Sequence, residues 1–197
     1  MPFLMIRNDI TKVAADAIVN PANRNLLQGS GTSRAIYQAA GEQEMTAACE
    51  AIGRCDLGRA VCTPAFGLSA KYVFHAVCPA WHGGGFGEAE QLAGAYHSAL
   101  ELASEYHCES VAFPLLSSGN YGYPKEQAFR DAVKEAARFG ISSDRAVRFE
   151  NDAQGVAVNY HVVSETVSRM REAPCCASIG AEWKEQIEAD FQKRHHR

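Results

Sequence analysis

The most informative stretch of this 197-residue chain is Asp16-Ala17-Ile18-Val19-Asn20-Pro21-Ala22-Asn23. Its apolar residues lie between polar ones, which predicts a short buried strand over residues 16–20. Residues 26–33 follow with the sequence Leu-Leu-Gln-Gly-Ser-Gly-Thr-Ser, a loop of small residues. From Ser33 to Ile52 the apolar spacing is helical, with an interruption at Gly41. The stretch therefore predicts a buried strand that leads through a flexible loop into a helix.

The same alternation continues along the chain. Apolar runs predict strands at residues 3–7, 59–63, 71–77 and 110–115, and helical spacing predicts helices at 88–107 and 124–139. Strands that are apolar almost throughout, alternating with helices, are typical of a mainly parallel sheet with helices on its faces. In such α/β sheets ligands bind beyond the carboxyl ends of the strands. We therefore expect the functional site at the junctions between strands and helices.

Composition excludes several classes of protein. Hydrophobic residues make up 47% of the chain, enough for a core, and the net charge of −4 argues against general nucleic-acid binding. No apolar run approaches the roughly 20 residues that span a bilayer, and the start of the chain lacks a secretory pattern. The seven scattered cysteines include no Cys-x-x-Cys pair. We expect a cytoplasmic protein with free thiols, no membrane contact, no metal and no cofactor.

The first junction has the chemistry of an anion site. Gly29, Ser30 and Gly31 precede Thr32 and Ser33, where the helix begins. Glycines allow a ligand to approach the backbone, and a helix N-terminus offers unpaired N–H groups with partial positive charge. The loop lacks the third glycine of the dinucleotide fingerprint and the Gly-Lys-Ser/Thr ending of a P-loop. From these residues alone, a plain turn capped by Thr32 or Ser33 stays open as an alternative.

A second junction has the same character. The strand predicted at residues 110–115 runs into Ser117-Ser118-Gly119-Asn120-Tyr121, and Pro124 opens the next helix. Successive N–H groups in such a loop can form an anion-binding nest, although ordinary turn chemistry gives the same residues. Near the start of the chain, Asp9 either accepts a hydrogen bond from an amine of a ligand or caps a turn. Two loops at one edge of a parallel sheet can grip a diphosphate between them.

Taken together and in order, these motifs resemble the macrodomain family. The resemblance rests on Asn8-Asp9-Ile10-Thr11, residues 16–23, Ala35-Ile36, Thr63-Pro64, His75-Ala76-Val77-Cys78-Pro79 and residues 113–124. It covers about residues 1–140. It implies a three-layer α/β/α fold with a mixed, mostly parallel sheet, and ADP-ribose or an ADP-ribosylated protein as the partner.

The resemblance also implies roles for individual residues. Asp9 would hold the adenine amine and Ile10 would donate its backbone N–H. Asn20 and Asn23 would lie near the distal ribose. The loop Gly29–Thr32 and the loop Ser117–Tyr121 would grip the diphosphate, and Tyr121 would also pack on the distal ribose.

The chain departs from the hydrolytic MacroD-like pattern in its glycine loop. When the glycine loop is aligned on Ala35-Ile36, Ser33 takes the position of an Asp that is thought to help activate water in these members. Ser30 and Arg34 each take the position of a glycine. A neutral serine has too high a pKa to act as a general base without a neighbouring base. Asn23 and Ser33 are the catalytic candidates. Three functions stay open: hydrolysis of an ADP-ribosyl or O-acetyl-ADP-ribose ester, non-catalytic ADP-ribose recognition, and phosphatase activity on ADP-ribose-1″-phosphate.

Other features are interpreted as structural. His75 lies in a strand pattern and is expected to be a hydrogen-bonded core histidine, and residues 82–85 (His-Gly-Gly-Gly) are expected to form a flexible loop. Beyond residue 140 we expect a last strand within residues 155–163, a loop at 173–180 and a short helix at 181–193. The family domain is assigned to residues 1–165 and a helical extension of unknown role to 166–197. Phe149 and Tyr160 are candidates for an aromatic beside adenine.

Overall fold

The computed structural model describes residues 3–6, 8–141 and 159–163. These described residues form six strands and four α-helices, with one short 3-10 helix, η1, near the start. The elements are β1 (Phe3–Ile6), η1 (Ile10–Lys12), β2 (Ala17–Ala22), α1 (Thr32–Ala40), α2 (Glu42–Ile52), β3 (Ala60–Pro64), β4 (Tyr72–Val77), α3 (Glu88–Glu105), β5 (Ser110–Pro114), α4 (Lys125–Arg138) and β6 (Asn159–Val163).

The strands form one mixed sheet in the order β1-β6-β5-β2-β4-β3. The central pairs β5–β2 and β2–β4 are parallel, whereas β1–β6, β6–β5 and β4–β3 are antiparallel. It follows that β1, β5, β2 and β4 all run in the same direction. Their carboxyl ends therefore share one edge of the sheet, as the sequence predicted for a mostly parallel arrangement.

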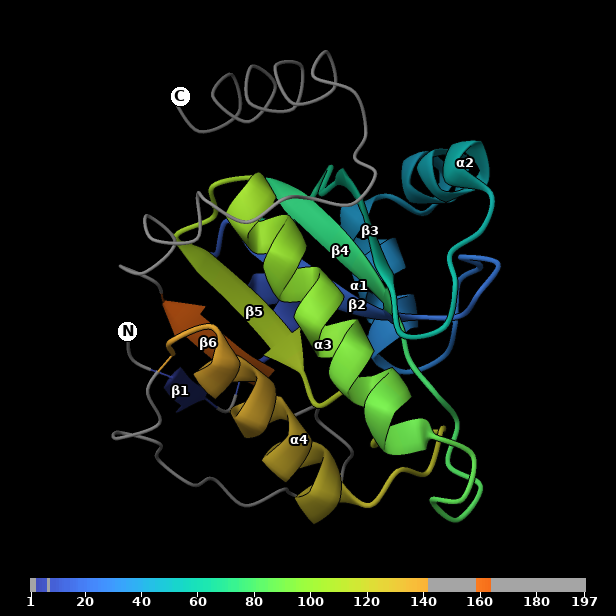
Figure 1. Cartoon of the computed structure of the whole chain (residues 1–197). Helices are drawn as coiled ribbons and strands as arrows, with labels where there is room; N and C mark the ends of the chain where they lie inside the picture. Colours follow the sequence, from blue (N-terminus) through green and yellow to red (C-terminus); the bar gives the residue numbers. More distant parts are fainter. Residues whose placement is uncertain (1–2, 7, 142–158, 164–197) are drawn as a thin grey trace.

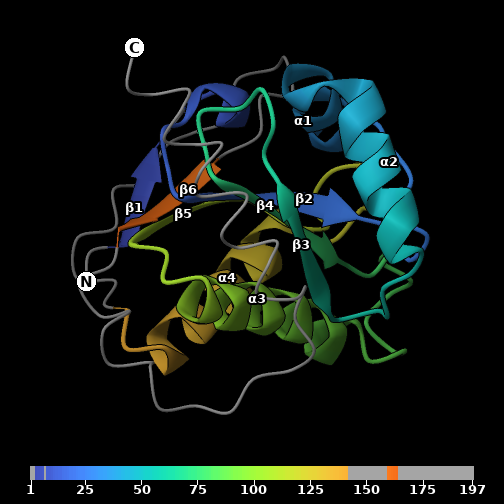
Figure 2. The ribbon, with the colours of Figure 1, turned by 90° about the horizontal axis from the view of Figure 1, so that it is seen from above.

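Helices cover both faces of the sheet. Figure 1 shows α3 and α4 side by side over one face, and the turned view in Figure 2 places α1 and α2 on the opposite side of the sheet. Each central strand is buried on both faces, which explains why its sequence is apolar almost without alternation. The three-layer α/β/α architecture expected from the resemblance is confirmed.

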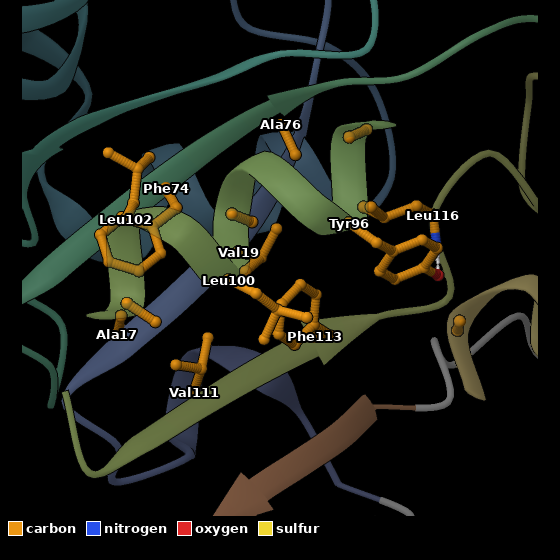
Figure 3. Close-up of a cluster of buried hydrophobic side chains, with 14 of the residues drawn as sticks. Ala17, Val19, Phe74, Ala76, Tyr96, Leu100, Leu102, Val111, Phe113 and Leu116 are labelled. Atoms are coloured by element: carbon orange, nitrogen blue, oxygen red, sulfur yellow. Dashed lines mark hydrogen bonds between the residues drawn. The ribbon is translucent and has the colours of Figure 1, made fainter. Parts of the chain in front are cut away.

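The two faces have separate cores. Against α3 lie Val19, Phe74 and Phe113, one from each of the three parallel strands (Figure 3). Their neighbours along the strands, such as Ile18 and Val73, point to the other face and pack with Ile36, Tyr37 and Met45 from α1 and α2. Alternate residues of one strand thus enter opposite cores, because successive side chains of a strand point to opposite faces.

The described elements agree closely with the sequence predictions. Gly41 divides the predicted helical region into α1 and α2, and its φ of 106° explains the break, because this backbone conformation favours glycine. The last strand, expected within residues 155–163, is present as β6 (Asn159–Val163). The predictions for residues 164–197, including the loop and the final helix, lie outside the described residues, as do those for residues 142–158 with Phe149. Within the described ranges, no helix has the length and apolar content needed to cross a membrane.

Candidate functional site

The site is built where β2 and β5 separate. Their parallel pairing is limited to Ala17 with Val111 and Ile18 with Ala112, while β2 continues beside β4 as far as Ala22. Pro21 lies in this unshared part of β2, which is compatible with its lack of an N–H group. The loops that follow the two strands therefore leave the sheet at neighbouring positions on its carboxyl edge.

The first loop is shaped by Asn23. Its side-chain amide donates to the carbonyl oxygen of Leu27 at 2.6 Å, and its Oδ1 accepts from the N–H groups of Asn25 and Leu27 at 3.1 and 3.2 Å. Leu26 is buried, whereas Leu27 is 57% exposed. In the structure, the side chain predicted to lie near the distal ribose thus holds its own loop in a tight turn.

The glycine segment ends at the N-terminus of α1. Ser33 is 3% exposed, and its Oγ accepts from the Gly29 N–H at 3.1 Å. Gly31 is the N-cap with φ of 57°, a conformation that favours glycine, and no side chain caps the helix. The first-turn N–H groups of an α-helix have no partner within the helix and carry partial positive charge. Thr32 begins this turn, so the segment retains the features of an anion site.

The second loop follows β5 and is held mainly by its own backbone. The N–H of Tyr123 donates to the Ser117 carbonyl at 3.0 Å, and that of Gly122 donates to Gly119 at 2.9 Å. The Ser118 hydroxyl donates to the carbonyl of Leu115 at 2.8 Å. Ser117 adopts φ of 62°, which is unusual for a residue with a side chain. The sharp turn exposes Gly119 and Asn120 at its tip.

The two loops touch each other. A hydrogen bond joins the Asn120 side-chain amide to the Ser30 hydroxyl, although the two residues are 90 positions apart in the sequence. The predicted diphosphate loops are thus neighbours at one edge of the sheet. An arrangement that placed them at opposite ends of the molecule would have excluded a shared ligand.

A third loop, missed as a site element by the sequence analysis, supports the second. The Trp81 N–H donates to the carbonyl of Tyr121 at 2.7 Å, which joins the loop after β4 to the loop after β5.

Residues 82–87 then curve around the buried carboxylate of Glu88. This carboxylate accepts from the N–H groups of His82, Gly84 and Phe86 at 3.0, 3.2 and 2.7 Å. The predicted flexible His-Gly-Gly-Gly segment is therefore organised around one carboxylate. An acidic residue directly after a glycine-rich segment was the available signal.

Burial alone would raise the pKa of Glu88. The backbone N–H groups of Glu88, Phe86, His82 and Gly84 outweigh that effect and lower the pKa to about 2. Hydrogen bonds to the ionised form favour it, so this carboxylate stays charged over the whole neutral range. Half-buried Tyr121 lies beside this loop, and burial raises the pKa of its hydroxyl, with a smaller contribution from Cys78.

Asp9 and Ile10 form the third predicted junction. Asp9 is the N-cap of η1, and its Oδ1 accepts from the backbone N–H and the hydroxyl of Thr11 at 3.0 and 2.8 Å. The hydroxyl of Thr11 is the main cause that lowers the pKa of Asp9. Ile10 is 3% exposed, and η1 lies against α1 and β5. In this structure Asp9 therefore caps a turn, which was one of the two roles expected from the sequence. Its contact with adenine stays a prediction.

Asn20 lies in the interior, away from the loop tips. It is 1% exposed, and its amide contacts Nδ1 of His75 on the neighbouring strand at 3.0 Å. Nε2 of His75 is 2.9 Å from the Thr63 hydroxyl, and burial lowers the pKa of His75 to about 3, so the imidazole is neutral. The expectation that His75 is a hydrogen-bonded core residue is confirmed. The ribose contact assigned to Asn20 stays a prediction.

Cys49 and Tyr37 complete this buried polar group. The Tyr37 hydroxyl donates to the Leu26 carbonyl at 2.7 Å and lies 3.1 Å from the Cys49 sulfur. The group thereby connects the first loop to the core. Across the described part of the chain, the cysteines are buried thiols, and no cluster of three or more potential metal ligands occurs.

Comparison with known proteins agrees with this architecture. The family model described as "Macro domain" matches residues 19–132. An O-acetyl-ADP-ribose deacetylase from Salmonella gallinarum is 48% identical over 139 residues, which cover 68% of this chain and 77% of the relative. A macro domain-containing protein from Chlorobaculum tepidum is 49% identical over 128 residues, or 65% of this chain and 74% of the relative.

Solved structures show the same similarity. A mutant Oceanobacillus iheyensis macrodomain with ADP-ribose superposes with a TM-score of 0.64 at 34% identity, covering 71% of this chain and 78% of the other. The macrodomain of the same organism with ADP gives a TM-score of 0.64 at 27% identity and covers 94% and 90% of the two chains. By sequence and by fold, this chain belongs to the macro domain family.

Proposed function

We propose that the protein binds ADP-ribose, free or attached to a protein, and hydrolyses the ester that links ADP-ribose to an acyl group. The observation that carries this proposal is the direct contact between the loop of Ser30 and the loop of Asn120. It brings the uncapped N-terminus of α1 beside a second small-residue turn. A diphosphate between them would meet N–H donors from both sides.

The similar proteins support the same ligand and reaction. Relatives at 48% identity carry the name O-acetyl-ADP-ribose deacetylase, and solved macrodomains of this fold hold ADP-ribose or ADP. We assign the diphosphate to residues 29–32 and 117–121, the adenine to Asp9 and Ile10, and the distal ribose to Asn23 and Tyr121. Asn20 lies in the interior, where its amide contacts Nδ1 of His75.

Ser33 limits how the reaction proceeds. Its buried hydroxyl accepts from the Gly29 N–H, so it shapes the loop, and an unassisted hydroxyl is too weak a base to activate water. General-base catalysis typically contributes about 10²–10⁴-fold, so we expect slow, base-independent hydrolysis in which Asn23 orients the water or the ribose. The same observation favours a second candidate function, recognition of ADP-ribosylated proteins without cleavage.

One experiment separates the two candidates. The wild type, Asn23→Ala and Ser33→Ala are each incubated with O-acetyl-ADP-ribose and, separately, with a glutamate-linked ADP-ribosylated protein. Binding affinity and product release are measured for each variant, because Asn23 also braces its loop. Turnover that survives Ser33→Ala and is lost in Asn23→Ala supports the hydrolase. Tight retention of both ligands with no release over hours supports recognition alone.

A further inference from the structure

We propose that Tyr37 of α1 and Tyr96 of α3 are positioning residues, whose hydroxyls hold the loops after β2 and β5 in the shape that receives ADP-ribose. The two helices cover opposite faces of the sheet, so each loop is held from a different layer of the fold. The inference rests on the ADP-ribose binding proposed above and names side chains that control its strength from the core. Neither tyrosine is among the residues assigned to the ligand.

The first loop contains a residue in an unfavourable backbone conformation. Leu26 has a φ of 55°, in the left-handed region that favours glycine, and its side chain is buried. The hydroxyl of Tyr37 donates to the Leu26 carbonyl at 2.7 Å, and the Leu26 N–H donates to the Asn23 carbonyl at 3.0 Å. The next residue, Leu27, contacts the Asn23 side chain through both its N–H and its carbonyl. The turn that orients Asn23 therefore depends on Leu26, and Tyr37 holds Leu26 in place.

The second loop repeats this arrangement. Ser117 has a φ of 62°, and the residue before it, Leu116, is fully buried. The Leu116 N–H donates to the hydroxyl of Tyr96 at 3.0 Å (Figure 3). The Tyr96 ring packs against Phe113 of β5 with the ring centroids 5.6 Å apart, so the core fixes the position of this hydroxyl. In each loop a buried tyrosine hydroxyl thus binds the backbone at the left-handed residue or directly beside it.

Removal of either hydroxyl would leave a buried backbone group without its partner. A left-handed conformation costs a residue with a side chain about as much free energy as one hydrogen bond contributes, so each hydroxyl offsets the strain beside it. Buried backbone groups without a partner are strongly disfavoured. The Leu26 carbonyl or the Leu116 N–H could regain a partner only if its loop moved toward water. Because phenylalanine keeps the ring, we expect Tyr37→Phe and Tyr96→Phe to retain the fold and to disturb the loops.

The two tyrosines act on different parts of the ligand. Tyr37 acts through Leu26 on the turn of Asn23, which we assigned to the distal ribose, while Ser33 separately holds the glycine segment. Tyr37→Phe is therefore expected to weaken ADP-ribose binding about two- to tenfold and to leave the Kd of ADP, which lacks the distal ribose, within about twofold. Tyr96 holds the loop assigned to the diphosphate, so Tyr96→Phe is expected to weaken the binding of both nucleotides by a similar factor.

The test is calorimetric titration of the full-length chain with ADP-ribose and with ADP, together with the melting temperature of each variant. Ser98→Ala is the matched control. Ser98 also lies on α3, and its buried hydroxyl accepts from the backbone N–H of Ala60 at 3.1 Å, on a strand that carries no assigned ligand residue. The control should melt at a lower temperature, as the two Phe variants should, and should bind both nucleotides as the wild type does.

Three results would overturn the proposal. A lower melting temperature with wild-type Kd values in either Phe variant would leave that tyrosine with a structural role alone. Equal weakening of ADP-ribose and ADP by Tyr37→Phe would contradict its action through the turn of Asn23. Weakening of both nucleotides by Ser98→Ala would show that any lost hydrogen bond of this kind lowers affinity.

Hydrogen exchange of the wild type provides a measurement that does not depend on the variants. The N–H groups of Leu26 and Leu116 should exchange slowly without ligand, because the tyrosines hold both loops before ADP-ribose binds. Fast exchange of either group would refute the positioning role. Wild-type protein that binds ADP-ribose no better than the Phe variants refutes this inference alone, whereas wild-type protein that binds no ADP-ribose refutes the proposed function as well.

Discussion

Among single residues, Ser33 has a role in the structure that differs from the role of an acid or a base. Its hydroxyl is buried and accepts the Gly29 N–H, which fixes the start of the glycine segment. The sequence identified the position as a departure from a catalytic Asp. It could not show the partner of the hydroxyl, because that depends on how the loop folds back on the first turn of α1.

Ser33→Ala tests this role. The variant leaves the partly buried Gly29 N–H without its acceptor, which costs about 1–3 kcal/mol, and loosens the loop before the ligand arrives. We expect ADP-ribose affinity to fall about five- to tenfold by isothermal titration calorimetry. Ser69→Ala, an exposed serine away from the loops, is the control and should bind as the wild type does. Unchanged affinity of Ser33→Ala would show that the Gly29 contact does not organise the loop for binding.

The lowered pKa of Glu88 predicts how the stability of the folded protein depends on pH. Its pKa is lowered to about 2 from an ordinary value of 4.5, because its backbone hydrogen bonds outweigh the effect of burial. A carboxylate with a depressed pKa in the folded state stabilises the protein above its unfolded pKa, and this contribution is lost as the pH falls. The contribution of Glu88 should be complete above about pH 4.5 and should decrease steadily toward pH 2.

The measurement is the melting temperature of the wild type and Glu88→Gln between pH 6 and pH 3. Glu88→Gln is expected to be less stable at pH 6 and to lose less stability than the wild type on acidification. Glu90→Gln, at an exposed position two residues away, should keep the wild-type slope. Parallel curves for the wild type and Glu88→Gln would mean that the loop does not depend on this charge.

At the scale of elements, the strands and helices were predictable because their signals are local. Apolar runs and helical spacing located β2, β4 and α3, and Gly41 and Pro124 marked helix boundaries. What local signals could not supply was register. The contact of Asn20 with His75 requires β2 and β4 to be paired side by side, and the Ser30–Asn120 contact requires two loops to meet across the sheet edge.

The packing of α3 depends on one glycine. A Cβ atom at Gly94 would lie 2.9 Å from the carbonyl oxygen of Gly58, a contact that forces the backbone to shift. Gly94→Ala gains about 1 kcal/mol of helix propensity but introduces overpacking worth about 1–3 kcal/mol. We expect a net loss of about 1 kcal/mol in the free energy of unfolding by urea denaturation.

Gly85→Ala is the matched control for this change. A Cβ atom at Gly85 meets nothing within 4 Å, and no left-handed backbone conformation applies there. Its free energy of unfolding should stay within about 0.5 kcal/mol of the wild type. A Gly94→Ala protein at least as stable as the wild type would show that α3 can move away from the loop of Gly58 at little cost.

At the scale of the whole molecule, the proposed domain boundary predicts that a shortened chain still folds and binds the ligand. The sheet is completed by β6, which ends at Val163, two residues before the boundary proposed at residue 165. A chain shortened to residues 1–165 keeps every described strand. We expect it to melt cooperatively and to bind ADP-ribose with the Kd of the full chain. Loss of cooperative melting or of binding would place residues 166–197 within the functional domain.

The central claim for the molecule is that two loops at one edge of the sheet hold a diphosphate between them. The most direct test is calorimetric titration of the wild-type chain with ADP-ribose, compared with adenosine monophosphate, which lacks the diphosphate. The account predicts saturable one-to-one binding of ADP-ribose, accompanied by a rise in melting temperature, and much weaker binding of adenosine monophosphate. Absence of heat and of a thermal shift with millimolar ADP-ribose, or equal affinity for the two nucleotides, would contradict it.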